Sequence, residues 1–342
     1  MKCKVLLRLI VSVTFAVGTA TQAITIDMVP VGDAGNAPDT CYEAPGYGSV
    51  SYVYKIGKYE VTNSQYQDFL NAVDPTGIDI YGLYNSNMKD SIYGGINFYS
   101  DAANGSKYYI KTGFDNKPVT FVSWYDAIRF VNWLQSGNTE SGTYTITNGG
   151  ANSGDVTLPD HSTFTSWHWI LPSEDEWYKS AYYKGGGTNA GYWEYATQSE
   201  EPPIPEAPEG NDSERGSVNY ANIIGEPINV GQYTFKPSIS AYGTYDQNGN
   251  VWEWNETIMG PEGTLRGIRG GGWGSGSWTP TGTLEATDLS ASFRYCSDTH
   301  GSHSHPYLEH ADTGFRVAMV PEPATLLLLG LGGLAALRKR KI

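Results

Sequence analysis

The chain has 342 residues, with 22 lysines and arginines against 36 aspartates and glutamates, which gives a formal net charge of -14. A surface this acidic repels phosphate backbones, so the charge argues against a nucleic-acid partner and favours divalent cations. The 10 tryptophans, 25 tyrosines and 41 glycines predict a fold that is packed with aromatic rings and rich in loops. The length is enough for one large domain or two small ones.

The N-terminus has the pattern of a secretory signal peptide. Lys2, Lys4 and Arg8 precede an apolar run, and small residues around Ala23 offer a cleavage site. We therefore set residues 1–23 aside. In an exported chain the two remaining cysteines, Cys41 and Cys296, could form a disulfide, but the sequence leaves open whether they pair.

The first half of the mature chain contains one strand and one helix that can be assigned. Residues 24–50 are a lead-in that is hard to assign, and the domain is expected to span residues 51–319. The alternation from Ser51 to Ile56 predicts a strand. Thr62 and Gln65 form a capping box for a helix from Asn63 to about Val73. Residues 74–116 predict long packed loops with one short helix.

Two further helices and a hairpin follow. Ser123, with Asp126 at the third helical position, predicts a helix to Leu134, and Ser173 with Glu176 forms a capping box for residues 174–183. Residues 142–147 and their glycine-rich sequel predict a hairpin, and residues 200–210 an exposed extended tract. Scattered helices among short strands and long loops indicate an α+β domain.

The C-terminus has three parts in series: the Pro-Glu-Pro box at residues 321–323, an apolar run over 324–337 and a basic cluster over 338–341. This order resembles the PEP-CTERM sorting signal, which we expect over residues 320–342. The resemblance implies an exosortase partner and delivery to the cell surface or extracellular matrix. The apolar run would hold the chain in the membrane before processing. An ordinary membrane anchor is the alternative, and whether the segment is cleaved stays open.

Six motifs occur in a defined order along the domain: Tyr54 to Asn63, Pro118 to Ala127, Leu171 to Trp177, Gly249 to Trp254, Arg269 to Trp273, and Gly314 to Arg316. Together they resemble the formylglycine-generating enzyme (sulfatase-modifying factor) family. The resemblance implies a C-type-lectin-like α+β fold with mixed twisted sheets, few helices and many loops. For the family's enzymes it also implies oxidation of a substrate cysteine to formylglycine by oxygen, with copper held by two cysteines.

This chain lacks both cysteines of that copper site. By the family pattern the two positions fall at Ser275 and near Pro280. Cu(I) prefers soft thiolates, whereas a serine hydroxyl is hard and neutral and proline has no side-chain donor. Copper is therefore not expected, and no catalytic residue is predicted. Cys296 alone cannot supply the pair, and we interpret it as structural.

The family's calcium motif is better preserved. The resemblance places the side chains of Asp246 and Glu253 and the carbonyls of Gly249 and Val251 on ligand positions, and Ca²⁺ prefers such hard oxygen donors. The alternative is that the two acids only cap the turn by hydrogen bonds. A second and weaker calcium site would involve Asn222 and Ile223, for which no acidic partner is evident.

Two other groups of residues are candidate binding sites. His300, His303 and His305 lie in one loop with His310 and could bind Zn²⁺ or Cu²⁺, although a polar loop without such a role is favoured. A ligand groove for sugar or peptide could include Arg269, Trp273, Ser275 and Trp278. Trp252 and Trp254 are assigned to the core.

These patterns favour an exported, surface- or matrix-associated domain that does not oxidise cysteine and acts as a binding or structural module. Extracellular polysaccharide or a surface protein is its possible partner. The alternative is an enzyme, either a formylglycine-generating oxidoreductase or another metal-dependent enzyme with a different ligand set.

Overall fold

The computed structural model describes residues 24–42, 45–209, 214–234, 238–260, 263–278, 284–294 and 304–322. Its α-helices are α1 (Asn63–Val73), α2 (Asn87–Asp90), α3 (Trp124–Ser136) and α4 (Glu174–Tyr182), with 3-10 turns at His161–Thr163 and Thr287–Leu289. None of these helices is long and apolar enough to cross a bilayer. The apolar run of residues 324–337 lies outside the described residues.

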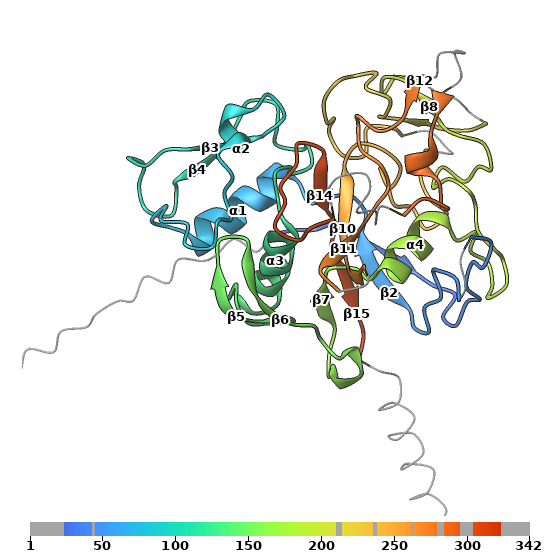
Figure 1. Ribbon diagram of the computed structural model, residues 1–342, viewed down its shortest axis with the longest axis horizontal. Helices are drawn as coiled ribbons and strands as arrows, with labels where there is room; N and C mark the ends of the chain where they lie inside the picture. Colours follow the sequence, from blue (N-terminus) through green and yellow to red (C-terminus); the bar gives the residue numbers. More distant parts are fainter. Residues whose placement is uncertain are drawn as a thin grey trace, which may run out of the picture.

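Two small sheets form the centre of the molecule (Figure 1). The first has the order β1 (Met28–Val31), β2 (Tyr54–Gly57), β15 (Ala318–Val320) and β7 (His168–Ile170), with antiparallel neighbours. The second has the order β11 (Leu265–Arg269), β10 (Trp252–Met259) and β14 (Thr313–Phe315). In this second sheet β10 pairs antiparallel with β11 and parallel with β14.

The remaining strands form separate pairs: β3 (Ile96–Phe98) with β4 (Tyr108–Ile110), β5 (Thr145–Gly150) with β6 (Ser153–Thr157), β8 (Ile204–Pro205) with β9 (Ser217–Val218), and β12 (Ser277–Trp278) with β13 (Leu284–Glu285). In Figure 1, α1 and α3 lie on one side of the central strands and α4 on the other. Few helices and several small mixed sheets confirm the α+β prediction.

Side-chain caps determine where the three longer helices begin. The side chains of Thr62, Ser123 and Ser173 each accept a hydrogen bond from the backbone amide of the third helical residue, whose own side chain accepts one from the backbone amide of the cap residue. These reciprocal bonds satisfy amides that have no partner within the helix. The three predicted helix starts are confirmed. The predicted hairpin is also present, as β5 and β6.

Elements without a strong local signal were missed. β1 lies inside the expected lead-in, yet it pairs with β2 over four residues, and Val31 is buried in the core. The folded domain therefore includes part of residues 24–50. β3 and β4 occur where loops were predicted, and β8 lies in the tract expected to be extended and exposed. Each of these strands has at most four residues and is stabilised by its partner strand.

An aromatic core lies between the helices and the second sheet. Phe130 of α3 lies 5.3 Å from Phe69 of α1 and 5.4 Å from Phe315 of β14, measured between ring centroids. Trp252 and Trp254 of β10 are buried in the same cluster, as predicted. Burial of such rings is the main source of stability in a fold with so little regular structure.

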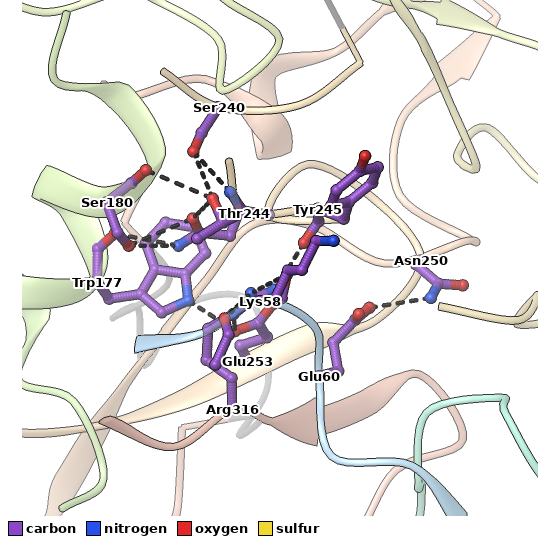
Figure 2. A network of polar contacts seen from close by, with 12 residues as sticks. Lys58, Glu60, Trp177, Ser180, Ser240, Thr244, Tyr245, Asn250, Glu253 and Arg316 are labelled. Atoms are coloured by element: carbon purple, nitrogen blue, oxygen red, sulfur yellow. Dashed lines mark hydrogen bonds and ion pairs between the residues drawn. The ribbon is translucent and has the colours of Figure 1, made fainter. Parts of the chain in front are cut away.

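A buried ion pair joins the two sheets (Figure 2). Arg316, between β14 and β15, donates to both carboxylate oxygens of Glu253 on β10, each at 2.6 Å. Its guanidinium also donates to the carbonyls of Gly57 at the end of β2 and of Tyr245, both at 2.9 Å. Glu253 further accepts a hydrogen bond from the Trp177 indole at 2.7 Å. One side chain therefore links four segments.

Removing Arg316 should destabilise the whole fold. Arg316→Met would leave the Glu253 charge buried without its cation, which typically costs about 3–5 kcal/mol. The matched control is Lys184→Met, which breaks the ion pair with Glu200, a partner whose side chain is 57% exposed. Exposed pairs contribute roughly 0–1 kcal/mol. Equal denaturation midpoints for the two variants would contradict the central role of Arg316.

A second buried carboxyl makes stability depend on pH. Glu256 of β10 accepts a hydrogen bond from the Tyr144 hydroxyl at 2.6 Å. Burial raises the pKa of Glu256 from 4.5 to about 8. The folded protein therefore holds this proton more tightly than the unfolded chain does, and the stabilisation is lost as pH rises through the folded pKa.

We expect the free energy of unfolding to decrease as the pH rises from 4.5, the ordinary pKa of Glu256, to about 8, its raised pKa in the folded protein. Glu256→Gln, which can still accept from Tyr144, should reduce the slope of stability against pH. Denaturant titrations at several pH values across this range measure the slope. The exposed Glu201→Gln is the control and should keep the wild-type slope, and an unchanged slope in Glu256→Gln would refute the assignment.

Candidate functional site

The predicted calcium turn follows Asp246. Its backbone takes up left-handed conformations, which glycine and asparagine adopt more readily than other residues. Asp246, Gly249 and Asn250 all have positive φ angles, of 61°, 79° and 59°. A Cβ at Gly249 would lie 2.4 Å from the carbonyl oxygen of Asn219, so only glycine fits there. The turn is tied to its surroundings because the Gly249 amide donates to the carbonyl of Gly270 at 2.9 Å.

Glu253, which the resemblance implied as a calcium ligand, has other partners in the structure. Both oxygens of Glu253 are bound by Arg316, and one also by Trp177, so the carboxylate is already neutralised by a cation. Asp246 accepts from the Gly231 amide at 2.6 Å. Among the residues that the structure describes, no three His, Cys, Asp or Glu side chains are grouped to hold a metal. Calcium binding here stays a prediction.

Three acids share the single cation of Arg316. Burial raises the pKa of Asp246 to about 6 and places that of Glu60 well above its usual range, with the neighbouring acids adding to both shifts. One Glu60 oxygen accepts from the Asn250 amide at 2.9 Å (Figure 2), and the other is buried without a hydrogen-bond partner. Burial and mutual repulsion therefore raise the pKa values of both Asp246 and Glu60.

Ser275, at the first family cysteine position, is a structural residue. Its side chain is buried, and the hydroxyl oxygen accepts from the Gly272 amide at 2.9 Å. A hydrogen bond from Ser275 also lowers the pKa of Asp288, although burial raises it overall. The Ser275 carbonyl accepts from the Ala221 amide at 2.7 Å. These contacts hold Ser275 within a turn. Pro280 lies outside the described residues.

Arg269, expected in a groove, is also internal. Its side chain is 1% exposed and donates to Glu174 at 2.8 Å. It also donates to the backbone carbonyls of Ala291 and Phe293. Arg294 binds the same Glu174 carboxylate at 2.6 Å. Arg269 therefore holds the segment after the second 3-10 turn in place, and it does not face solvent.

Trp273 is the expected groove residue that stays partly exposed. Its ring lies 4.8 Å from that of Tyr93, between centroids, and its N–H points to the carbonyl of Ala311 at 3.5 Å. The side chain of Trp278 lies outside the described residues. The structure therefore does not bring the four expected groove residues to one surface: two are internal, one is partly exposed and one is not described.

The other predicted site residues are dispersed. His305 stacks on Tyr307 with centroids 5.3 Å apart, whereas His300 and His303 lie outside the described residues. Asn222 and Ile223 form an exposed turn in which Asn222 has a φ of 55°. Cys41 is exposed and carries a free thiol, and Cys296 lies outside the described residues. Within the described part of the chain, these positions do not come together as a metal site.

Two cavities lie in the described part of the structure, and of the sequence-predicted positions described above only Cys41 lines one of them, the second. One, of about 220 Å³, is lined by Tyr52 and His161 together with Pro321 and Glu322, where the domain ends and the Pro-Glu-Pro box begins. The other, of about 340 Å³, is lined by acidic and aromatic side chains that include Asp39, Tyr192 and Glu194. Ser275 and Trp273 line neither cavity.

The sequence reading missed the partner of Glu253. Arg316 was noted only as the last residue of a motif, yet it organises the polar centre. A signal was present, because a lone arginine within Gly314-Phe-Arg-Val-Ala318 is surrounded by residues typical of a core. A buried guanidinium requires a carboxylate partner. Which of the many acids supplies it depends on the tertiary structure.

Comparison with known proteins places this geometry in a family. A model of the sulfatase-modifying factor enzyme 1-like domain matches residues 19–320, and the PEP-CTERM protein-sorting motif matches residues 320–341. No curated protein sequence is significantly similar to the chain.

Solved structures show a similar fold at low identity. CarF is 21% identical over 87% of this chain and 99% of its own, with a TM-score of 0.51. Treponema denticola variable protein 1 is 20% identical over 89% of this chain and 97% of its own, with a TM-score of 0.48. PvdO from Pseudomonas aeruginosa is 19% identical over 86% and 91%, with a TM-score of 0.44.

The CarF likeness supports the fold and, at this identity, nothing about activity. The family model covers most of the sequence, including the motifs around Glu253, Arg269 and Arg316. The chain therefore belongs to the sulfatase-modifying factor enzyme 1-like domain family and ends in a PEP-CTERM sorting motif.

Proposed function

We propose that this protein is a non-oxidising member of its family, exported and surface- or matrix-associated, which acts as a binding or structural module. One observation carries the proposal. Ser275, where the family's enzymes have a copper-binding cysteine, is buried and hydrogen-bonded within a turn. A hard, neutral hydroxyl in that setting is a poor ligand for Cu(I).

The sorting motif supports the location. A PEP-CTERM motif implies export and processing by an exosortase, and here it directly follows the folded domain. Pro321 and Glu322 line a cavity at the domain surface, so the box begins where the domain ends. A module delivered in this way would meet extracellular polysaccharide or other surface proteins, which are the partner classes that we favour.

Of the predicted groove residues whose side chains are described, Trp273 is partly exposed, and its ring contacts the partly exposed ring of Tyr93. Exposed aromatic rings bind the apolar faces of sugars and peptide side chains. Both rings lie close to the loop before β14, because Trp273 reaches the carbonyl of Ala311. We place the ligand contact of the proposed module there.

The purified protein should leave a sulfatase-type cysteine peptide unchanged when copper and oxygen are supplied. Ser275→Cys should be equally inactive, because one thiolate in a buried turn cannot replace a pair. Mass spectrometry of the peptide detects the aldehyde, with an active formylglycine-generating enzyme as the positive control. Aldehyde formation by the wild-type protein would sink the proposal.

Metal analysis separates the binding module from a metal-dependent enzyme. After dialysis the protein should retain neither copper nor zinc in stoichiometric amounts, because the described residues assemble no cluster of three ligands for a soft or borderline metal. Bound copper or zinc that is lost when His303 and His305 are both changed to alanine would favour the enzyme instead. The matched control is His161→Ala, outside that loop.

A further inference from the structure

A second polar cluster, separate from the contacts of Arg316, lies where four segments meet. Asp126 lies in the first turn of α3, and Glu309 lies in the loop before β14. Asn85 precedes α2, and Asn152 is in the turn between β5 and β6. None of these residues was singled out as a ligand from the sequence.

Asp126 is fully buried, and only one of its oxygens is satisfied. One oxygen accepts from the Ser123 amide and the Ser123 hydroxyl, each at 2.8 Å. The other oxygen is buried without a hydrogen-bond partner among the described residues. A carboxylate with 0% exposure is costly to bury, and an unpaired oxygen on it is rare in native proteins.

Glu309 repeats the pattern from the other side of the cluster. One oxygen accepts from the side-chain amides of Asn85 and Asn152, each at 2.9 Å. The other oxygen is buried and has no hydrogen-bond partner among the described residues. The two carboxylates repel each other, because the negative charge of Glu309 lies close enough to Asp126 to raise the pKa of Asp126.

The cluster contains more acceptor oxygens than hydrogen-bond donors among the described residues. Because the Asn152 amide nitrogen donates to Glu309, its oxygen faces the Ser123 hydroxyl, at 3.0 Å. Ser123 has one hydroxyl proton, yet it lies within hydrogen-bond distance of both this oxygen and Asp126. Two orphaned carboxylate oxygens and a surplus amide oxygen thus occur together.

The neighbouring charged side chains that the structure describes do not form an ion pair with Asp126 or Glu309. Asp79 adds a further negative charge that acts on Glu309. The nearest cation on the same helix, Arg129, is committed to Glu140 at 2.7 Å and to the carbonyl of Ser153 at 3.0 Å. Its charge moderates the repulsion at Asp126 but makes no ion pair with it.

We propose that Asp126 and Glu309, with the oxygens of Asn152 and Ser123, form a binding site for a hard divalent cation of the calcium type. Carboxylate, amide and hydroxyl oxygens are the donors that Ca²⁺ prefers, and water completes its shell where protein ligands are few. The set contains no sulfur or imidazole donor, so it disfavours copper and zinc. The site is distinct from the turn after Asp246.

A cation here would fasten the loop before β14 to α3. That loop already contacts the helix start through backbone bonds, from Trp124 to Pro306 at 3.0 Å and from Phe121 to His310 at 2.9 Å. Its continuation at Ala311 also contacts Trp273. Binding at Glu309 therefore stabilises the segment next to the partly exposed aromatic pair.

The test compares melting temperatures of the full protein at neutral pH, after chelation and with calcium chloride added back. Calcium should raise the melting temperature of the wild type, because it binds the folded state alone. Glu309→Gln should lose this shift. In calcium-free buffer Glu309→Gln should melt no lower than the wild type, since a buried charge has been removed, which shows that the variant folds.

Two controls separate this site from others. The exposed Glu201→Gln and the turn variant Asp246→Asn should keep the calcium shift. Atomic emission on gel-filtered protein should find bound calcium in the wild type and its loss in Glu309→Gln. Absence of any calcium effect on the wild type would mean that a proton or water satisfies the orphaned oxygens, and the proposal would be wrong. A shift lost only in Asp246→Asn would equally overturn it.

Discussion

The structure depends on one buried ion pair, in which Arg316 binds Glu253. Desolvating two charges is expensive, and it is offset here because the guanidinium has carbonyl partners as well as both carboxylate oxygens. The pair joins β10 of one sheet to the junction of β14 and β15, and through Gly57 to β2. In a domain with short strands and long loops, this link holds together sheets that share no strand.

Internal hydrogen bonds also order the turn that contains Ser275, where the resemblance places the first cysteine of the family's enzymes. Two contacts order the glycine-rich segment after β11. Arg269 binds Glu174, and at Ser275 the side-chain hydroxyl accepts a hydrogen bond from the backbone amide of Gly272. Membership of the family therefore establishes the fold of this chain and leaves its activity to the proposal.

Short-range patterns predicted the helices and failed for the weakest strands. The caps at Thr62, Ser123 and Ser173 are local, since donor and acceptor lie three residues apart, so sequence reading could find them. β1 and β3 have four and three residues and form only because a distant segment pairs with them. The expected groove was read from neighbours in sequence, whereas Arg269 turns inward to the segment after Leu289.

By itself the sequence determined the family, the helix starts, the core assignment of Trp252 and Trp254, and the sorting motif, because each is encoded in contiguous residues. Only the tertiary structure decided which acid meets which cation. It paired Glu253 with Arg316, sixty-three positions apart, and buried one oxygen of Asp126 and one of Glu309 without a hydrogen-bond partner among the described residues. With 36 acidic residues in the chain, pairing depends on burial and distance, which no local pattern specifies.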